Sequence, residues 1–155
     1  MLRKIFTFIL CLIPWFASSI VPVDYSYFDS LALPFFTPPR LFFQIAWIIV
    51  YILLAISISG IFNTYKFRDV SLSYKITLAI NYLFNQSFTL LFFGLRNNFL
   101  GFFSCLGTFV SCLFLYQETF QLKEKSTKFL DPYILLSLFA SILSLIIYIM
   151  NTLQY

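Results

Sequence analysis

Two groups of amide and aromatic side chains, each spaced three to four residues apart, lie within apolar stretches of the chain. The groups are Gln44, Trp47 and Tyr51, and Asn81, Asn85 and Phe88. This spacing places the members of each group on one face of a helix. Amides inside a membrane are costly and normally face other helices, where they form interhelical hydrogen bonds. The same pattern also suits the wall of a small-molecule site, which is mostly apolar with a few polar groups. The residues alone leave both interpretations open.

Acid–base and metal chemistry find little support in the sequence. The chain has no histidine, which excludes a histidine general base, zinc site or haem ligand. None of the 6 carboxylates lies in the middle of an apolar run, so no general acid–base pair is expected among the helices. Cys11, Cys105 and Cys112 lie in apolar stretches without a CxxC pair. They are interpreted as small core residues and not as a metal site or disulfide.

The elements that carry these residues must be membrane helices. Of the 155 residues, 61% are hydrophobic and 10% charged, against roughly 25% charged in soluble domains. A soluble domain of this size cannot bury so much apolar surface, and disorder needs the opposite composition. Apolar runs at about 5–21, 41–62, 74–94, 99–117 and 131–150 predict an all-α integral membrane protein, a bundle of five transmembrane helices. Residues 1–155 are therefore predicted to form a single membrane domain in a lipid bilayer.

The first apolar run has a second interpretation. Two basic residues precede it and the small residues Ala17, Ser18 and Ser19 follow it, a pattern also seen in cleaved signal peptides. Pro14 would disturb a helix at this place. The residues of this run by themselves leave a retained helix and a signal peptide both open.

The connection at 22–40 is the most informative segment. Pro34, Pro38 and Pro39 predict a stiff, extended approach to the second helix. With Trp47 and Tyr51 the segment resembles the translocator protein family, also called tryptophan-rich sensory proteins (TspO/MBR). The family pattern there is roughly W-Y-x-x-L-x-K-P-x-W-T-P-P, followed by V-W-x-x-L-Y.

Two later motifs fall in the same order and spacing. Residues 84–94 read FNQSFTLLFFG, against L-N-x-x-W-S-x-L-F-F-G in the family. Pro132 and Tyr133 begin the last run and Asn151 closes it, as in the family pattern P-Y-L-x-W-x-x-F-A-x-x-L-N with a closing Asn. The resemblance covers about residues 25–151, and it implies that the first run is retained as a helix.

The chain departs from the family mainly in its tryptophans. Trp47 stands at a family tryptophan position, whereas other such positions hold Tyr27, Phe36, Phe88 and Leu136. Leu33 replaces the loop lysine and Ser144 replaces an asparagine. The second tryptophan, Trp15, lies outside the matched motifs and is expected to lie outside the site.

The resemblance implies a membrane receptor for a flat hydrophobic ligand, of which a porphyrin or other tetrapyrrole is the leading candidate. Its role would be sensing, sequestration or transport. No cofactor is required, although a porphyrin or haem-type ligand is compatible with the family. The ligand-binding residues implied are Phe28, Pro38, Pro39, Gln44, Trp47, Tyr51, Asn81, Asn85, Phe88, Leu136, Phe139, Ala140 and Ser144.

Two other functions remain open at this stage. One is a pocketless structural or assembly protein that binds lipid or partner helices. The other is a light-dependent porphyrin-degrading enzyme, which is disfavoured because Leu136 replaces the family tryptophan of the last helix. The family also forms homodimers, and a homodimer is expected here.

Small residues recur on one face of the fourth predicted helix: Gly101, Ser104, Thr108 and Ser111. Such a stripe allows membrane helices to pack closely. It is interpreted as a packing seam, either within the bundle or as part of a dimer interface.

Basic residues divide unequally between the two membrane sides. With five helices, one side carries Arg3, Lys4, Lys66, Arg68, Lys75, Lys123, Lys125 and Lys128, and the other carries Arg40 and Arg96. Basic residues concentrate on the inner side, so the N-terminus is predicted to be inside. Their scattered placement at membrane flanks gives no reason to expect a nucleic-acid partner.

This charge distribution predicts that reporters fused to the two ends lie on opposite sides of the membrane. A phosphatase reporter, active only outside, should be active at the C-terminus and inactive at the N-terminus. If both fusions were active, or both inactive, the two ends would lie on the same side, which would contradict five retained helices.

Overall fold

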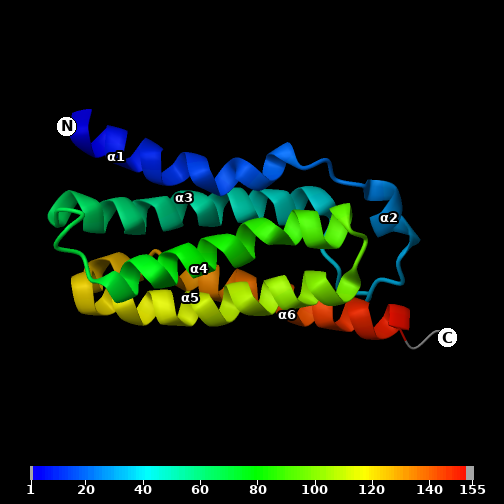
Figure 1. The fold of residues 1–155 in the computed structure, drawn as a ribbon. Helices are drawn as coiled ribbons and strands as arrows, with labels where there is room; N and C mark the ends of the chain where they lie inside the picture. The colour runs from blue at the N-terminus through cyan, green and yellow to red at the C-terminus, as the bar shows by residue number, and fades with distance from the viewer. Residues whose placement is uncertain (1, 153–155) are drawn as a thin grey trace.

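A computed structural model describes residues 2–152, and within this range the chain forms helices and no strands (Figure 1). The elements are α1 (Leu2–Leu12), η1 (Ile13–Ile20), α2 (Tyr25–Ser30), α3 (Arg40–Thr64), α4 (Leu72–Phe88), η2 (Thr89–Gly94), α5 (Asn98–Thr127) and α6 (Asp131–Thr152). Five segments are long and apolar enough to cross a membrane: α1 with η1, α3, α4 with η2, α5 up to Lys123, and α6. The predicted all-α, five-helix membrane fold is confirmed.

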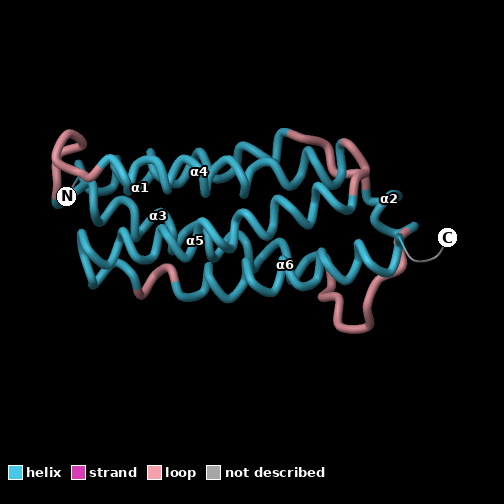
Figure 2. The backbone as a smooth tube through the Cα atoms, turned by 60° about the horizontal axis from the view of Figure 1, so that its bottom comes forward, coloured by secondary structure: helices cyan, strands magenta, loops and turns pink. Residues whose placement is uncertain are grey.

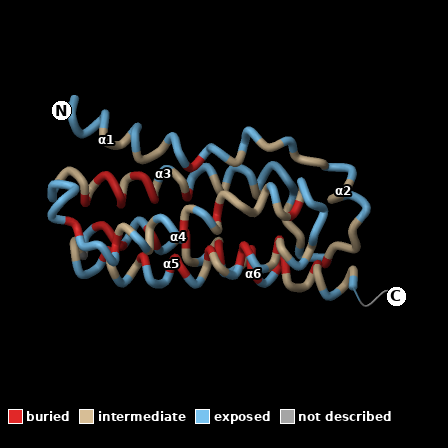
Figure 3. Tube along the Cα trace, in the orientation of Figure 1, coloured by how far each residue is buried: buried red, intermediate tan, exposed pale blue. Residues whose placement is uncertain are grey.

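The spans run side by side along one long axis, with the N-terminus at one end and the end of α6 at the other (Figures 1 and 2). The short helix α2 lies at the end of the bundle where α6 finishes. Buried positions gather between α3, α4, α5 and α6, whereas α1 has no buried residue and packs mainly on α3 (Figure 3). Most of the large exposed side chains are apolar, as expected for a surface in contact with lipid.

Local sequence explains where the spans change geometry. Pro14 stands at the start of η1, where the α-helix tightens into a 3₁₀-helix. In the same half of the bundle, α4 loosens into the π-helical turn η2, which ends at Gly94. The following turn places Arg96 at φ 49°, and Asn97 then caps α5 by accepting from the backbone N–H of Leu100.

Two predicted connections are partly wrong. Residues 118–130 are largely helical, because α5 continues past its apolar run through residues with good helix propensity to Thr127. Its regularity is broken only at Lys123, whose backbone is extended. The predicted extended segment 22–40 contains α2, whose first turn is capped by the Asp24 carboxylate.

The small-residue face of α5 packs inside the bundle. Ser104, Thr108 and Ser111 are buried, and each hydroxyl donates to a carbonyl of the preceding turn. Since the face is covered by helices of the same chain, it is a packing seam and offers no dimer surface. A homodimer would have to use another face.

The closest approach in this seam is at Gly107 of α5. A Cβ atom built there would lie 2.3 Å from Cδ1 of Phe84 on α4. Real carbon atoms do not approach so closely, so any side chain at this position must displace the Phe84 ring. The two helices can therefore pack at their present distance only with glycine at position 107.

Gly107→Ala should lower the free energy of unfolding by about 1–3 kcal/mol, because it overpacks the α4–α5 contact. In a Phe84→Ala background the same substitution should cost less than half as much, since the obstructing ring is gone. Thermal melts of the four proteins in detergent measure both effects. Equal losses in the two backgrounds would show that the ring does not limit the approach.

Candidate functional site

A cavity of about 430 Å³ lies in the half of the bundle that α2 covers. Its wall combines residues of η1, α2, α3, the end of α4, η2, α5 and α6, so every span contributes. The wall is mainly apolar and aromatic, with a few hydroxyl and amide groups. Small-molecule sites have this composition and volumes of roughly 300–1,000 Å³.

The structure brings most of the residues predicted for the site together around this cavity. They are Phe28, Pro38, Gln44, Trp47, Tyr51, Asn85, Phe88, Ala140 and Ser144. Trp47 and Tyr51 share one face of α3, as predicted, with ring centroids 5.6 Å apart. Phe88 stacks on Phe92 of η2 at 5.2 Å.

Four predicted residues do not line the cavity. Pro39 is the N-cap of α3, Leu136 packs against the buried core, and Asn81 is buried between helices. Phe139 packs instead against aromatic rings on the lid and on α3, with centroid distances of 6.4 and 6.5 Å. Sequence places these residues on a helix or in a motif but does not define which side of the helix meets the open space.

Trp15 is the main residue that the sequence interpretation missed. It was expected to lie outside the site, yet it is 3% exposed and lines the cavity. Its indole stacks on Tyr51 at 5.9 Å and meets the edges of Tyr82 and Tyr133 at 5.3 and 6.5 Å. No motif signalled this position, because Trp15 reaches the cavity only through the packing of η1 on α4 and of its ring on Tyr51 of α3.

Small residues of the helix seam also reach the cavity. Cys105 and Thr108 of α5 and Ser137 of α6 line it beside Ser144. The Ser144 hydroxyl lies 3.4 Å from the Cys105 sulfur. The spacing of Thr108 within the α5 stripe is the one signal in the sequence, and it indicates helix packing, within the bundle or at a dimer interface, and not a ligand site.

Beneath the cavity, buried side chains form a connected hydrogen-bond network. The Tyr133 hydroxyl donates to Oδ1 of Asn81 at 2.8 Å and accepts from Nδ2 of Asn85 at 3.4 Å. Nδ2 of Asn81 donates to the Thr108 carbonyl at 3.1 Å and to the Ser111 hydroxyl at 2.9 Å. Asn81 therefore joins α4 to α5 and α6, which is the helix–helix role left open by its sequence position.

The network continues from Asn85 to the remaining spans. Oδ1 of Asn85 accepts from the Tyr51 hydroxyl on α3 at 2.8 Å and from Nε2 of Gln86 at 2.9 Å. Gln86 also accepts from the Ser18 backbone N–H at 2.8 Å and donates to the Trp15 carbonyl at 3.2 Å. All five spans are linked in this way.

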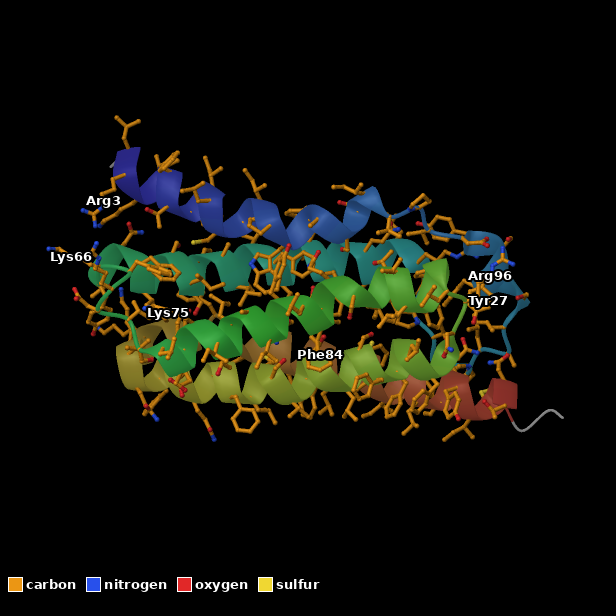
Figure 4. The ribbon with its side chains drawn as sticks, viewed as in Figure 1. Arg3, Tyr27, Lys66, Lys75, Phe84 and Arg96 are labelled. Atoms are coloured by element: carbon orange, nitrogen blue, oxygen red, sulfur yellow. The ribbon has the colours of Figure 1, made fainter. Side chains whose placement is uncertain are left out.

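Residues 22–40 form a lid over the cavity, and two ion pairs hold it. Arg40 at the start of α3 pairs with Asp29 of α2. Arg96, in the turn before α5, pairs with Asp24, and Figure 4 shows Arg96 at this end of the bundle. Both pairs are largely exposed, so each stabilises the closed lid only modestly.

Direct hydrogen bonds also tie the lid to the end of the bundle. The Asn151 side chain accepts from the Ala32 backbone N–H at 2.9 Å and donates to the Ala32 carbonyl at 3.0 Å. The Tyr27 hydroxyl donates to Oδ1 of Asn98 at 2.7 Å. The closing asparagine of the third sequence motif therefore anchors the lid to α6.

Asp24 stays ionised over the whole neutral and mildly acidic range. Its pKa is lowered to about 2, because the Ser26 hydroxyl and the Tyr27 backbone N–H donate to its carboxylate and Arg96 lies beside it. An unfolded aspartate has a pKa of about 3.9. The contribution of this carboxylate to the closed lid is therefore complete above about pH 4 and is lost as the pH falls towards 2.

Comparison with known proteins decides the family. The sequence profile of the TspO/MBR family matches residues 6–150. The chain belongs to the TspO/MBR family. It is 34% identical over 135 residues to the tryptophan-rich protein TspO of Bacillus cereus. The aligned region covers 87% of each of the two chains.

Two further relatives support membership of the TspO/MBR family. The membrane protein YtaB of Bacillus subtilis is 30% identical over 87% of this chain and 86% of its own length. The tryptophan-rich protein TspO of Archaeoglobus fulgidus is 28% identical over 81% of this chain and 80% of its own. The chain therefore spans most of the length of these proteins, and the predicted resemblance is confirmed.

The buried network predicts that Asn81 contributes strongly to stability. Asn81→Leu should lower the free energy of unfolding by about 2 kcal/mol, because it leaves the Tyr133 hydroxyl and the Ser111 hydroxyl without this partner. Gln44→Leu is the matched control, since Gln44 makes a single exposed hydrogen bond to Tyr25. Melts of both variants in detergent compare them, and an equal effect of the two substitutions would contradict a structural role for the network.

Proposed function

We propose that this membrane protein binds a flat apolar ligand of the tetrapyrrole class in the cavity under the lid, in sensing, sequestration or transport. The observation that carries the proposal is an aromatic cavity of about 430 Å³ that lies inside a membrane bundle and contains both tryptophans of the chain. A flat conjugated ligand can stack on such rings over a large area.

The arrangement of the rings supports a planar ligand. Trp15, Trp47 and Tyr51 come from η1 and α3, whereas Phe88 and Phe92 come from α4 and η2. Rings therefore reach the cavity from helices that are far apart in the sequence. The hydrogen-bond network fixes Tyr51 and supports the backbone at Trp15, so this part of the wall is formed before a ligand arrives.

The alternatives have less support. A pocketless assembly protein would not need an aromatic cavity of this size. For an enzyme, no carboxylate lines the cavity among the described residues, so acid–base catalysis has no visible pair. Degradation of a bound porphyrin under light would appear as loss of its absorption band in an illuminated sample but not in the dark.

We also propose that the N-terminus lies inside the cell or compartment. Arg3, Lys66 and Lys75 lie towards the end of the bundle opposite Arg96 (Figure 4). At the lid end, Arg96 and Arg40 are each paired with a carboxylate. Among the side chains that the structure describes, positive charge without an ion-pair partner concentrates at the N-terminal end, which agrees with an inner location.

Trp47→Ala should weaken porphyrin binding about 30-fold, equivalent to roughly 2 kcal/mol for a buried aromatic anchor. Trp47→Phe should weaken it less, because much of the stacking area remains. Quenching of tryptophan fluorescence during a porphyrin titration gives the affinity of the parent and of Trp47→Phe. Quenching of porphyrin emission gives the affinity of every variant, including Trp47→Ala.

The control is Phe120→Ala, since Phe120 is 52% exposed on α5 and does not line the cavity. Trp15→Phe is not a suitable control, because Trp15 lines the same cavity wall. Thermal melts exclude loss of fold as the cause. Unchanged affinity in folded Trp47→Ala would remove α3 from the ligand site, and absence of any porphyrin binding by the parent would overturn the proposed function.

A further inference from the structure

One charged side chain reaches the cavity wall among the described residues, and it is Arg40. Its guanidinium lies over the ring of Tyr25 at 5.0 Å and over the ring of Phe28 at 5.7 Å. Both rings also line the cavity. The cation is therefore held at the rim of the aromatic space, where it stacks on rings and still presents N–H donors.

The partner that Arg40 has now is easily exchanged. Asp29 lies on the lid outside the cavity wall, and the two side chains are 44% and 56% exposed. An ion pair this exposed contributes little free energy, because water solvates both charges well. Asp29 can turn into water without leaving a buried charge behind.

The rest of the wall offers no second place for an anion. The deep part of the cavity carries neutral groups, namely the side chains of Thr108, Ser137 and Ser144 and the amide of Asn85. A carboxylate there would be desolvated without a cation beside it, which is strongly unfavourable. An acidic ligand would therefore enter with its apolar body first and its acid group at the rim.

We propose that Arg40 selects flat apolar ligands that carry a carboxylate. The ligand acid takes the place of Asp29 on the guanidinium, whose planar fork of N–H donors matches a carboxylate, while the flat body lies among the rings. This inference rests on the proposed function and names the chemical class within it: an acid, and not its neutral ester.

The test compares protoporphyrin IX, whose propionate groups are free acids, with its dimethyl ester, which has the same ring system without charge. The parent should bind the acid more tightly than the ester. Arg40→Gln should weaken binding of the acid about tenfold more than binding of the ester, the loss expected for one charge-assisted hydrogen-bonded contact. Arg40→Lys, which keeps the charge without the fork, should fall between them.

Two matched variants separate this role from a structural one. Arg96→Gln removes the other ion pair of the lid at a position outside the cavity, so it should change the affinities for acid and ester by the same factor. Asp29→Asn removes a lid ion pair and also the competing carboxylate, so it should strengthen binding of the acid relative to the ester. A merely structural ion pair would give losses of the same sign for Arg40→Gln and Asp29→Asn.

The outcomes distinguish this inference from the function on which it depends. Equal affinity of the parent for acid and ester, or equal effects of Arg40→Gln on both, would overturn the role of Arg40 and leave porphyrin binding intact. Failure of the parent to bind either porphyrin would overturn both proposals. Melts of each variant show whether it is folded, and Asp29→Asn decides the question should Arg40→Gln be unstable.

Discussion

The need to satisfy buried amides within the membrane governs this structure. Asn81 and Asn85 are buried on one face of α4, and an unsatisfied amide inside a membrane bundle would be costly. Tyr51 and Tyr133 supply partners from α3 and α6, and Gln86 extends the connection to η1. Because hydrogen bonds are directional, these contacts fix how each span is rotated about its own axis, which packing of similar apolar side chains alone would leave open.

The cavity is a direct consequence of this arrangement. Tyr51 and Asn85 belong both to the network and to the cavity wall, so the bonds that hold the helices together also position the polar groups offered to a ligand. Trp15 packs on Tyr51 and Tyr133 and is held in turn through its backbone. The lid is held differently, by exposed ion pairs and a few hydrogen bonds at the end of the bundle. The base is therefore held more firmly than its cover, an arrangement that suits the proposed binding of a ligand.

Replacement of tryptophan by other aromatic residues changes the chemistry of the wall more than its shape. Phe88 on the wall and Tyr27 outside it keep an aromatic ring at positions where the resemblance implies tryptophan, and both rings pack against Phe92. The indole N–H donors are lost there, so specificity must come from the remaining polar groups. Those groups are neutral deep in the cavity and cationic at its rim, where Arg40 lies over two rings. The cavity is therefore polarised from rim to floor.

The sequence by itself determined the class and the number of spans, because composition and helical periodicity depend only on local chemistry. Its three motifs carried the resemblance to the TspO/MBR family, which the profile match confirmed. Spacing fixed that Trp47 and Tyr51 share one helix face, whereas the resemblance implied that this face and Asn85 meet the cavity that they line. Tertiary structure alone decided that Trp15 joins the wall while Asn81 lies behind it, and that the small-residue face of α5 is covered within the chain. The physical reason is that the sequence defines which residues share one side of a helix. What that side contacts depends on the rotation and distance of the neighbouring helices. These were set here by the amide network and by the close approach at Gly107.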